Sequence, residues 1–194
     1  MHTIAAIPGE DAAIQETESA LIQAAQEDLA AFAPLYQRYR DRIYAYLRTR
    51  TRTAEDAADL TQQVFLQALD ALPHYRSGRA PFVAWLVRIA RNTAATYHKR
   101  HRQTITWDLV PESLQPRAED DLDARVAQRE AVARLHVVLG ACAACTREVL
   151  ALHFAARLTV AETAAAVGKS EAAVKKQLTR TIHALKEQYH EVSY

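Results

Sequence analysis

The chain has 194 residues, of which 49% are hydrophobic and 24% charged, and it contains only four glycines and six prolines. This hydrophobic content is sufficient for a packed core in one domain or in two small ones. Alanine is abundant and alternating β-branched runs are absent, so we expect an all-α protein. No apolar run reaches the roughly 18–20 residues that span a membrane. No lysine or arginine precedes Arg38, which argues against a targeting peptide and favours a cytoplasmic protein.

The formal net charge is only +1, but the charges are segregated along the chain. Acidic residues gather in residues 1–27 and again in 103–124, whereas basic residues gather in 97–102 and near the C-terminus. A protein that holds DNA alone, by releasing counterions, is usually more basic. We therefore expect any DNA binding by this chain to depend on a partner.

Residues 1–27 are predicted to be an acidic N-terminal extension, in which the signals for a helix near Ala12 are weak. An N-terminal helical domain is predicted over about 28–102. Its first helix spans about 28–50, with an apolar face made by Phe32, Tyr36, Tyr39, Ile43 and Leu47.

The second and third helices of this domain are likewise predicted from apolar faces at helical spacing. The second opens at Thr53, with Asp56 as its capping partner, and its apolar face holds Leu60, Val64, Phe65, Leu69 and Leu72. The third begins near Pro81, a residue suited to a first helical position, and its apolar face holds Phe82, Trp85, Leu86, Ile89, Thr93 and Tyr97. A turn-rich loop, 73–81, separates these two helices.

The helical pattern breaks over 103–124, which contains Pro111, Pro116 and an acidic run. We predict an extended acidic linker there, followed by a second helical domain over 125–189. The fold class is therefore two small helical domains joined by a linker.

The second domain ends in a pattern typical of a helix-turn-helix. Thr159 and Glu162 form a capping box, Gly168 suits the left-handed residue that ends a helix, and Ser170 suits the next N-cap. The last helix has an apolar stripe at helical spacing, made by Val174, Leu178, Ile182 and Leu185. Basic side chains lie mostly off that stripe, where they can face DNA. The alternative is an ordinary helical hairpin with a solvated basic face.

Cys142 and Cys145 form a lone CxxC pair, which supplies half of a tetrahedral zinc site. His136 and His153 could complete four ligands, but this spacing matches no zinc finger. Because the cysteines lie among alanines, we expect both to pack as small apolar residues, with no metal and no cofactor.

Two passages are specific: "EDAADLTQQVFLQALDAL" (55–72) and "WLVRIARNTAATYHKR" (85–100). They match the pattern D-A-x-D-L-T-Q-x-V-F, through Asp56, Ala57, Asp59, Leu60, Thr61, Gln62, Val64 and Phe65. They also match W-L-x-x-I-A-R-N, through Trp85, Leu86, Ile89, Ala90, Arg91 and Asn92. With the C-terminal helix-turn-helix, the chain resembles the extracytoplasmic-function (ECF) sigma factors of the sigma-seventy family over about 28–188.

The resemblance implies that the protein is an alternative sigma factor, which directs RNA polymerase to promoters. It makes 28–102 the family's region 2 and 125–189 its region 4. The implied partners are promoter DNA and core RNA polymerase, through its β′ clamp helices and β flap. An anti-sigma factor is a further partner that the resemblance allows; a membrane partner is not expected.

The resemblance also implies site residues. Those that dock on the clamp helices are Asp56, Asp59, Gln62 and Gln63. Those that capture the opened strand of the minus-ten element are Tyr75, Arg76, Arg79, Arg91, Asn92, Lys99 and Arg100. Those that read the upstream, minus-thirty-five element are Ser170, Lys175, Lys176, Thr179 and Arg180.

The residue chemistry agrees with these roles, because aromatic and amide groups hold unstacked bases while cationic groups hold phosphates. For Tyr75, base stacking and ordinary packing remain equally open, whereas Trp85 is assigned to the core. The chain departs from the family pattern at Thr96, Lys99, 139–145, Ala173 and Gln177, which bears on promoter sequence rather than on class.

Two other readings remain. A stand-alone helix-turn-helix regulator would bind DNA without polymerase, and a redox- or zinc-responsive protein would use the two cysteines. We do not expect an enzyme, because no nucleophile–base pair, phosphate loop or carboxylate constellation is present.

Overall fold

The computed structural model describes residues 8–78, 80–101, 133–135 and 137–191, which are helical with no strand among them. This confirms the all-α prediction. The elements are α1(Pro8–Glu27), η1(Leu29–Phe32), α2(Ala33–Arg48), α3(Ala54–Ala71), η2(Leu72–His74), α4(Phe82–His101), α6(Ala144–Leu150), the π-helical turn η4(Ala151–Ala155), α7(Val160–Val167) and α8(Glu171–Glu191). None of the described helices is both long and apolar enough to cross a bilayer.

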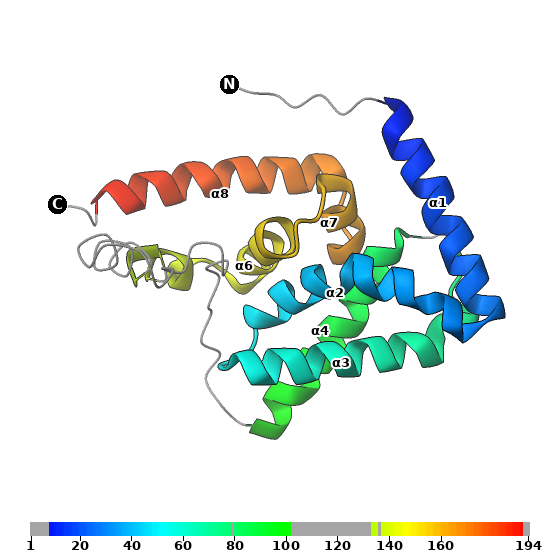
Figure 1. The fold of residues 1–194 in the computed structure, drawn as a ribbon. Helices are drawn as coiled ribbons and strands as arrows, with labels where there is room; N and C mark the ends of the chain where they lie inside the picture. The colour runs from blue at the N-terminus through cyan, green and yellow to red at the C-terminus, as the bar shows by residue number, and fades with distance from the viewer. Residues whose placement is uncertain (1–7, 79, 102–132, 136, 192–194) are drawn as a thin grey trace, which may run out of the picture.

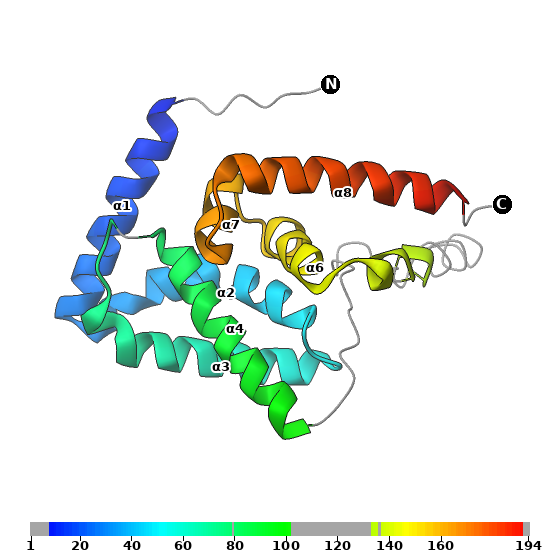
Figure 2. The same cartoon turned by 180° about the vertical axis from the view of Figure 1, so that it is seen from behind.

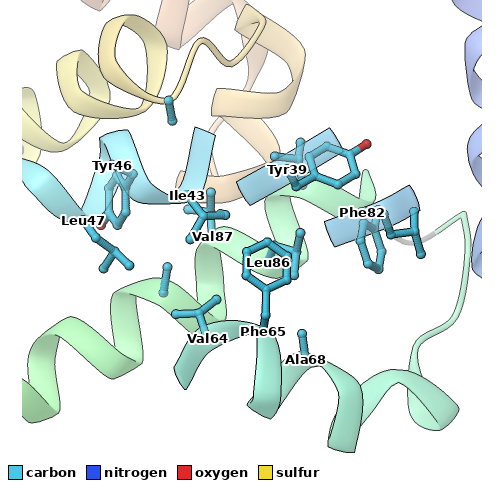
Figure 3. Close-up of a cluster of buried hydrophobic side chains, with 14 of the residues drawn as sticks. Tyr39, Ile43, Tyr46, Leu47, Val64, Phe65, Ala68, Phe82, Leu86 and Val87 are labelled. Carbon is cyan, nitrogen blue, oxygen red and sulfur yellow. The ribbon is translucent and has the colours of Figure 1, made fainter. Parts of the chain in front are cut away.

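Helices α2, α3 and α4 pack against one another as a bundle, and their apolar faces meet in its centre (Figure 3). Ile43, Val64 and Leu86 from the three helices are each fully buried there. The start of α3 is capped as predicted, because the Thr53 hydroxyl accepts a hydrogen bond from the Asp56 amide at 3.0 Å. The predicted apolar faces of these three helices are confirmed.

Helix α1 lies within the residues that the sequence indicated as a separate acidic extension. It packs instead on the bundle, where Ile22 and Ala25 are buried in the same core as α2–α4. The Gln26 amide donates hydrogen bonds to the carbonyl oxygens of Leu72 and Tyr75, at 2.9 and 3.0 Å. The end of α1 therefore holds the chain where it leaves α3.

The C-terminal helices follow the predicted local pattern. Thr159 and Glu162 make the reciprocal capping box at the start of α7, and Gly168 ends that helix in the left-handed region, at φ 70°. The Ser170 hydroxyl accepts a hydrogen bond from the Ala173 amide at 3.3 Å. Val174 and Leu178 of α8 are buried in a second, smaller core.

The two helical groups pack together. The C-terminal helices lie against α2 and α4, on the side of the bundle away from α3 (Figures 1 and 2). Four residues of the C-terminal group are buried in the larger core: Ala151, Leu152, Ala156 and Leu158. The sequence did not predict this contact. The predicted linker, 103–124, lies outside the described residues.

Candidate nucleic-acid and polymerase interfaces

The outer face of α3 carries the side chains for which docking was predicted. Asp59, Gln62 and Gln63 are exposed on α3, the helix that lies on the far side of the bundle from the C-terminal helices (Figure 1). Leu66 is on the same face, since it follows Gln62 and Gln63 by one helical turn. Leu66 is 63% exposed. Sequence reasoning missed Leu66, although its position off the buried stripe could have indicated it.

Asp56 differs from the other three predicted docking residues because the fold occupies its carboxylate. Its Oδ2 accepts hydrogen bonds from the hydroxyls of Thr53, at 2.8 Å, and Tyr97, at 2.9 Å. Burial and this hydrogen bond raise the pKa of Tyr97, so the phenol stays protonated and donates. Asp56 thus ties the start of α3 to α4.

Helix α4 brings four of the predicted strand-capturing residues onto one element. Asn92, Lys99 and Arg100 are exposed. Arg91 is exposed as well, at 43% of its side chain, but it also contacts the C-terminal group. Its Nη1 donates to the Ala166 carbonyl oxygen at 3.1 Å.

The loop between α3 and α4 is less accessible than its sequence indicated. Tyr75 is only 8% exposed, and its ring packs against the rings of Phe82 and Trp85, with centroids 5.3 and 5.1 Å away. Its hydroxyl donates to the Ala80 carbonyl oxygen at 3.0 Å, and burial raises the pKa of the phenol. Of the two readings left open, this structure favours packing for Tyr75.

The other two predicted strand-capturing residues of this loop are Arg76 and Arg79. Arg76 is exposed, with Nη1 3.5 Å from the Pro73 carbonyl oxygen. Arg79 lies outside the described residues. Trp85 packs against the core, as predicted.

Helix α8 presents the predicted upstream-element residues on its outer surface. Lys175, Lys176, Thr179 and Arg180 are all exposed. The hydroxyl of Thr179 donates to the Lys175 carbonyl oxygen at 3.0 Å. A row of long cationic side chains on one helical face can reach phosphates or base edges in a major groove.

Gln177 and Ser170 position this helix. The Gln177 amide donates to the Thr146 hydroxyl at 3.3 Å, which joins α8 to α6, and its oxygen accepts from Lys169 at 2.8 Å. Ser170 caps the first turn of α8, so in this structure its hydroxyl serves the helix itself.

The two cysteines are free thiols that differ in exposure. Cys142 is half-buried and Cys145 is exposed, so the packing prediction fails for Cys145. Burial raises the pKa of the Cys142 thiol, which makes it less reactive. His153 contacts the Leu158 carbonyl oxygen, at 2.8 Å, and His136 lies outside the described residues. Within those residues, no group of three or more His, Cys, Asp or Glu side chains could hold a metal ion.

Comparison with known proteins shows the family to which the chain belongs. Residues 35–104, which include α3, α4 and all of α2 but its first two residues, match the family model of sigma-70 region 2. The chain is 30% identical over 180 residues to the ECF RNA polymerase sigma factor SigD of Mycobacterium tuberculosis, covering 92% of this chain and 82% of SigD. The chain belongs to the ECF sigma factors of the sigma-70 family.

A second relative of this sigma factor is the ECF RNA polymerase sigma factor BldN of Streptomyces coelicolor. The two are 34% identical over 173 residues, which cover 85% of this chain and 63% of the length of BldN.

Solved structures agree on the fold. The sigma factor resembles CnrH, solved in complex with the cytosolic domain of CnrY, with a TM-score of 0.61 and 26% identity, over 87% of this chain and 94% of CnrH. It also shares its fold with the sigma factor RpoE of Bartonella quintana, solved with the anti-sigma factor NepR (TM-score 0.56, 20% identity, 81% of this chain and 95% of RpoE).

Proposed function

We propose that this sigma factor binds core RNA polymerase and directs it to a specific class of promoters, using three surfaces. The outer face of α3 docks on the β′ clamp helices, through Asp59, Gln62 and Gln63. Helix α4 captures the opened strand of the minus-ten element. The α7–α8 pair acts as a helix-turn-helix that reads the minus-thirty-five element.

One observation supports this proposal most directly: the polar residues of α3 and the basic residues of α8 are left exposed on separate helices. Asp59, Gln62 and Gln63 take no part in the core of the bundle, and Lys175, Lys176 and Arg180 take no part in the smaller core. A helix that buries one face and leaves a specific polar face unused is suited to contact a partner.

In this proposal the chain divides as the sequence predicted, with region 2 over about 28–102 and region 4 over about 125–189. Region 4 is also proposed to contact the β flap. CnrH and RpoE were each solved with a protein bound, so an anti-sigma factor is a further proposed partner. Membership of the sigma-70 family does not favour the alternative of a stand-alone DNA-binding regulator.

Reconstitution tests the proposal. The purified chain is mixed with core RNA polymerase and a promoter library, and the transcripts are sequenced. We expect transcripts to start downstream of one shared pair of elements and only when both proteins are present. Specific nanomolar DNA binding by the chain alone, with no gain from core polymerase, would contradict the proposal and favour a stand-alone regulator.

A further inference from the structure

Helix α1 makes a side-chain contact with the loop that joins α3 to α4. The Gln26 amide, which is partly buried, donates to the Leu72 carbonyl oxygen at 2.9 Å and to the Tyr75 carbonyl oxygen at 3.0 Å. Both partners can only accept, so the amide nitrogen of Gln26 must face them and uses both of its hydrogens. The loop runs beside α1 at this point (Figures 1 and 2). Gln26 therefore joins α1 to two backbone positions of the chain that leaves α3.

The two carbonyl groups lie where the chain changes from helical to extended. Leu72 begins the 3₁₀ turn η2, and its carbonyl oxygen also accepts from the Tyr75 amide at 3.0 Å. Tyr75 itself is extended, with φ -66° and ψ 137°. A carbonyl group at the end of a helix has no partner within the helix and must find one elsewhere. Gln26 supplies that partner and so fixes the backbone at the point where the loop starts.

The side chain of Tyr75 holds the same point from the other side. Its ring packs against Phe82 and Trp85 at the start of α4, and its hydroxyl donates to the Ala80 carbonyl oxygen. The loop is thus closed across its base, from Tyr75 to Ala80, and this base is held to both α1 and α4. Residues 76–78, which follow Tyr75, are exposed.

Arg76 is the residue on which this anchoring acts. The Tyr75 carbonyl group that Gln26 binds belongs to the peptide group that joins Tyr75 to Arg76. Because a peptide group is planar, fixing its carbonyl also fixes the direction in which the chain enters Arg76. The Arg76 side chain is exposed, and a guanidinium group is suited to bind a phosphate. A backbone that is ordered before DNA arrives loses less entropy on binding.

We propose that Gln26 is a positioning residue for strand capture: it holds the base of the loop so that Arg76 is directed to the opened strand before DNA binds. The proposal rests on the proposed function for the role of Arg76. Gln26 acts through the loop backbone and does not itself touch DNA. Helix α1, which the sequence indicated as part of a separate extension, thereby takes part in promoter opening.

The variant Gln26→Met tests this role. Methionine keeps the length of the side chain and its partly buried stem, but it cannot donate to either carbonyl group. The matched control is Gln23→Met on the same helix, because Gln23 is exposed and its amide donates to Glu27 at 3.4 Å, one turn further along α1. Neither change alters the net charge, so neither changes the long-range attraction to DNA.

Amide hydrogen exchange of the full chain, followed by NMR, measures the effect on the loop without polymerase or DNA. We expect the Tyr75 amide to exchange about five- to tenfold faster in Gln26→Met, the shift in local opening that loss of an ordinary hydrogen bond produces. The Val64 amide, within α3, should keep the parent rate, which shows that the bundle is intact. Gln23→Met should match the parent at both amides. An unchanged rate at Tyr75 in Gln26→Met would overturn the proposal.

Strand capture is measured with holoenzyme, assembled from the full chain and core polymerase. The DNA is a fork of a promoter recovered by reconstitution, with its non-template minus-ten segment single-stranded. Gln26→Met should bind this fork about five- to tenfold more weakly, because a smaller fraction of loops is in the competent arrangement. Its affinity for core polymerase should stay at the parent value, and Gln23→Met should match the parent in both measurements. Capture by Gln26→Met at the parent affinity would overturn the proposal.

A double-mutant cycle with Arg76→Ala shows whether Gln26 acts through the loop. In the Arg76→Ala background, Gln26→Met should weaken capture by less than about twofold, because the residue that it positions is absent. In the Asn92→Ala background the full loss should remain, because Asn92 lies on α4 and not on the loop. A full loss in the Arg76→Ala background, or capture by Arg76→Ala at the parent affinity, would overturn the proposal.

The parent holoenzyme separates the two proposals. If it does not capture the fork, the proposed function fails and this inference fails with it. If it captures the fork and Gln26→Met captures it equally well, only the role of Gln26 is contradicted.

Discussion

At the scale of single residues, Arg91 and Asn92 show how neighbouring positions on one helix diverge. Successive helical residues point about 100° apart. Arg91 consequently contacts the C-terminal group, with 43% of its side chain still exposed, whereas Asn92 is exposed on another side of α4. Asn92 is thus one of the strand-capturing candidates that the fold leaves accessible.

Asn92→Ala is expected to weaken strand capture by about 1–3 kcal/mol, the range for one good polar contact to a base. The free energy of unfolding should change by less than about 0.5 kcal/mol, because the side chain is exposed. Permanganate footprinting of duplex promoters measures the loss of opening. Binding to core polymerase should be retained, and templates already mismatched at the minus-ten region should restore part of the activity. Normal opening by the variant would show that Asn92 is only a surface residue.

Two buried phenols predict how stability responds to alkali. Burial raises the pKa of Tyr39 and Tyr46 above the ordinary value near 10, so both stay protonated in the folded chain. Above about pH 10 the unfolded chain loses these protons first, and the free energy of unfolding falls as the pH rises. Tyr39→Phe should reduce the slope of the free energy of unfolding against pH, by at most about 1.4 kcal/mol per pH unit. Denaturant titrations between pH 8 and 11 measure it, and an unchanged slope would contradict the assignment.

At the scale of elements, the turn between α7 and α8 depends on one backbone conformation. Gly168 has a φ of 70°, and a Cβ atom added there would meet nothing within 4 Å. A substitution at this position is therefore unfavourable through backbone strain rather than through a clash.

Gly168→Ala is expected to lower the free energy of unfolding by about 1–2 kcal/mol, with a smaller loss for Gly168→Asn. The matched control is Gly140→Ala, a helical position that also has open space around its Cβ, where we expect a gain of up to about 1 kcal/mol. Chemical denaturation measures both variants. Equal effects at the two positions would contradict the role of the left-handed turn.

The basic face of α8 gives a second prediction at this scale. Lys176→Ala and Arg180→Ala should each reduce initiation at promoters with an intact upstream element, and a lost phosphate contact should lower the salt slope by about one. Lys186→Ala removes the same charge further along α8 and is the matched control. In vitro transcription at several salt concentrations measures the effect. If scrambling the upstream element leaves the losses unchanged, α8 does not read that element.

At the scale of the whole molecule, the low net charge and the packing of α7 on α4 both disfavour DNA binding by the isolated chain. The net charge of +1 provides little non-specific attraction to DNA. The packing of α7 against α4 also engages Arg91. Both features indicate that the isolated chain is a weak DNA binder.

We therefore expect the chain alone to bind a recovered promoter duplex no more tightly than about micromolar at physiological salt, the non-specific range. Addition of core polymerase should tighten specific binding by about 10³-fold or more. Fluorescence anisotropy with and without core polymerase measures the difference. A chain that alone distinguishes the promoter from scrambled DNA would contradict this prediction.

Features that depend on residues a few positions apart could be predicted from the sequence. The caps at Thr53 and Thr159, the left-handed Gly168 and the apolar faces of the helices all follow from local hydrogen bonding and helical period. Motif residues exposed at helix surfaces, such as Asn92 and Lys176, were also predicted correctly as accessible.

Contacts between distant segments could not be predicted from the sequence. Tyr46 and Glu148 are 102 positions apart, and no periodicity or cap relates them. The same holds for the burial of Tyr75 under α4 and for the packing of Ile22 on the bundle. Arg91 pairs with Glu148 only because the fold brings α4 and α6 together. The strength of a charged contact depends on the distance between the two groups and on their burial, not on their positions in the chain.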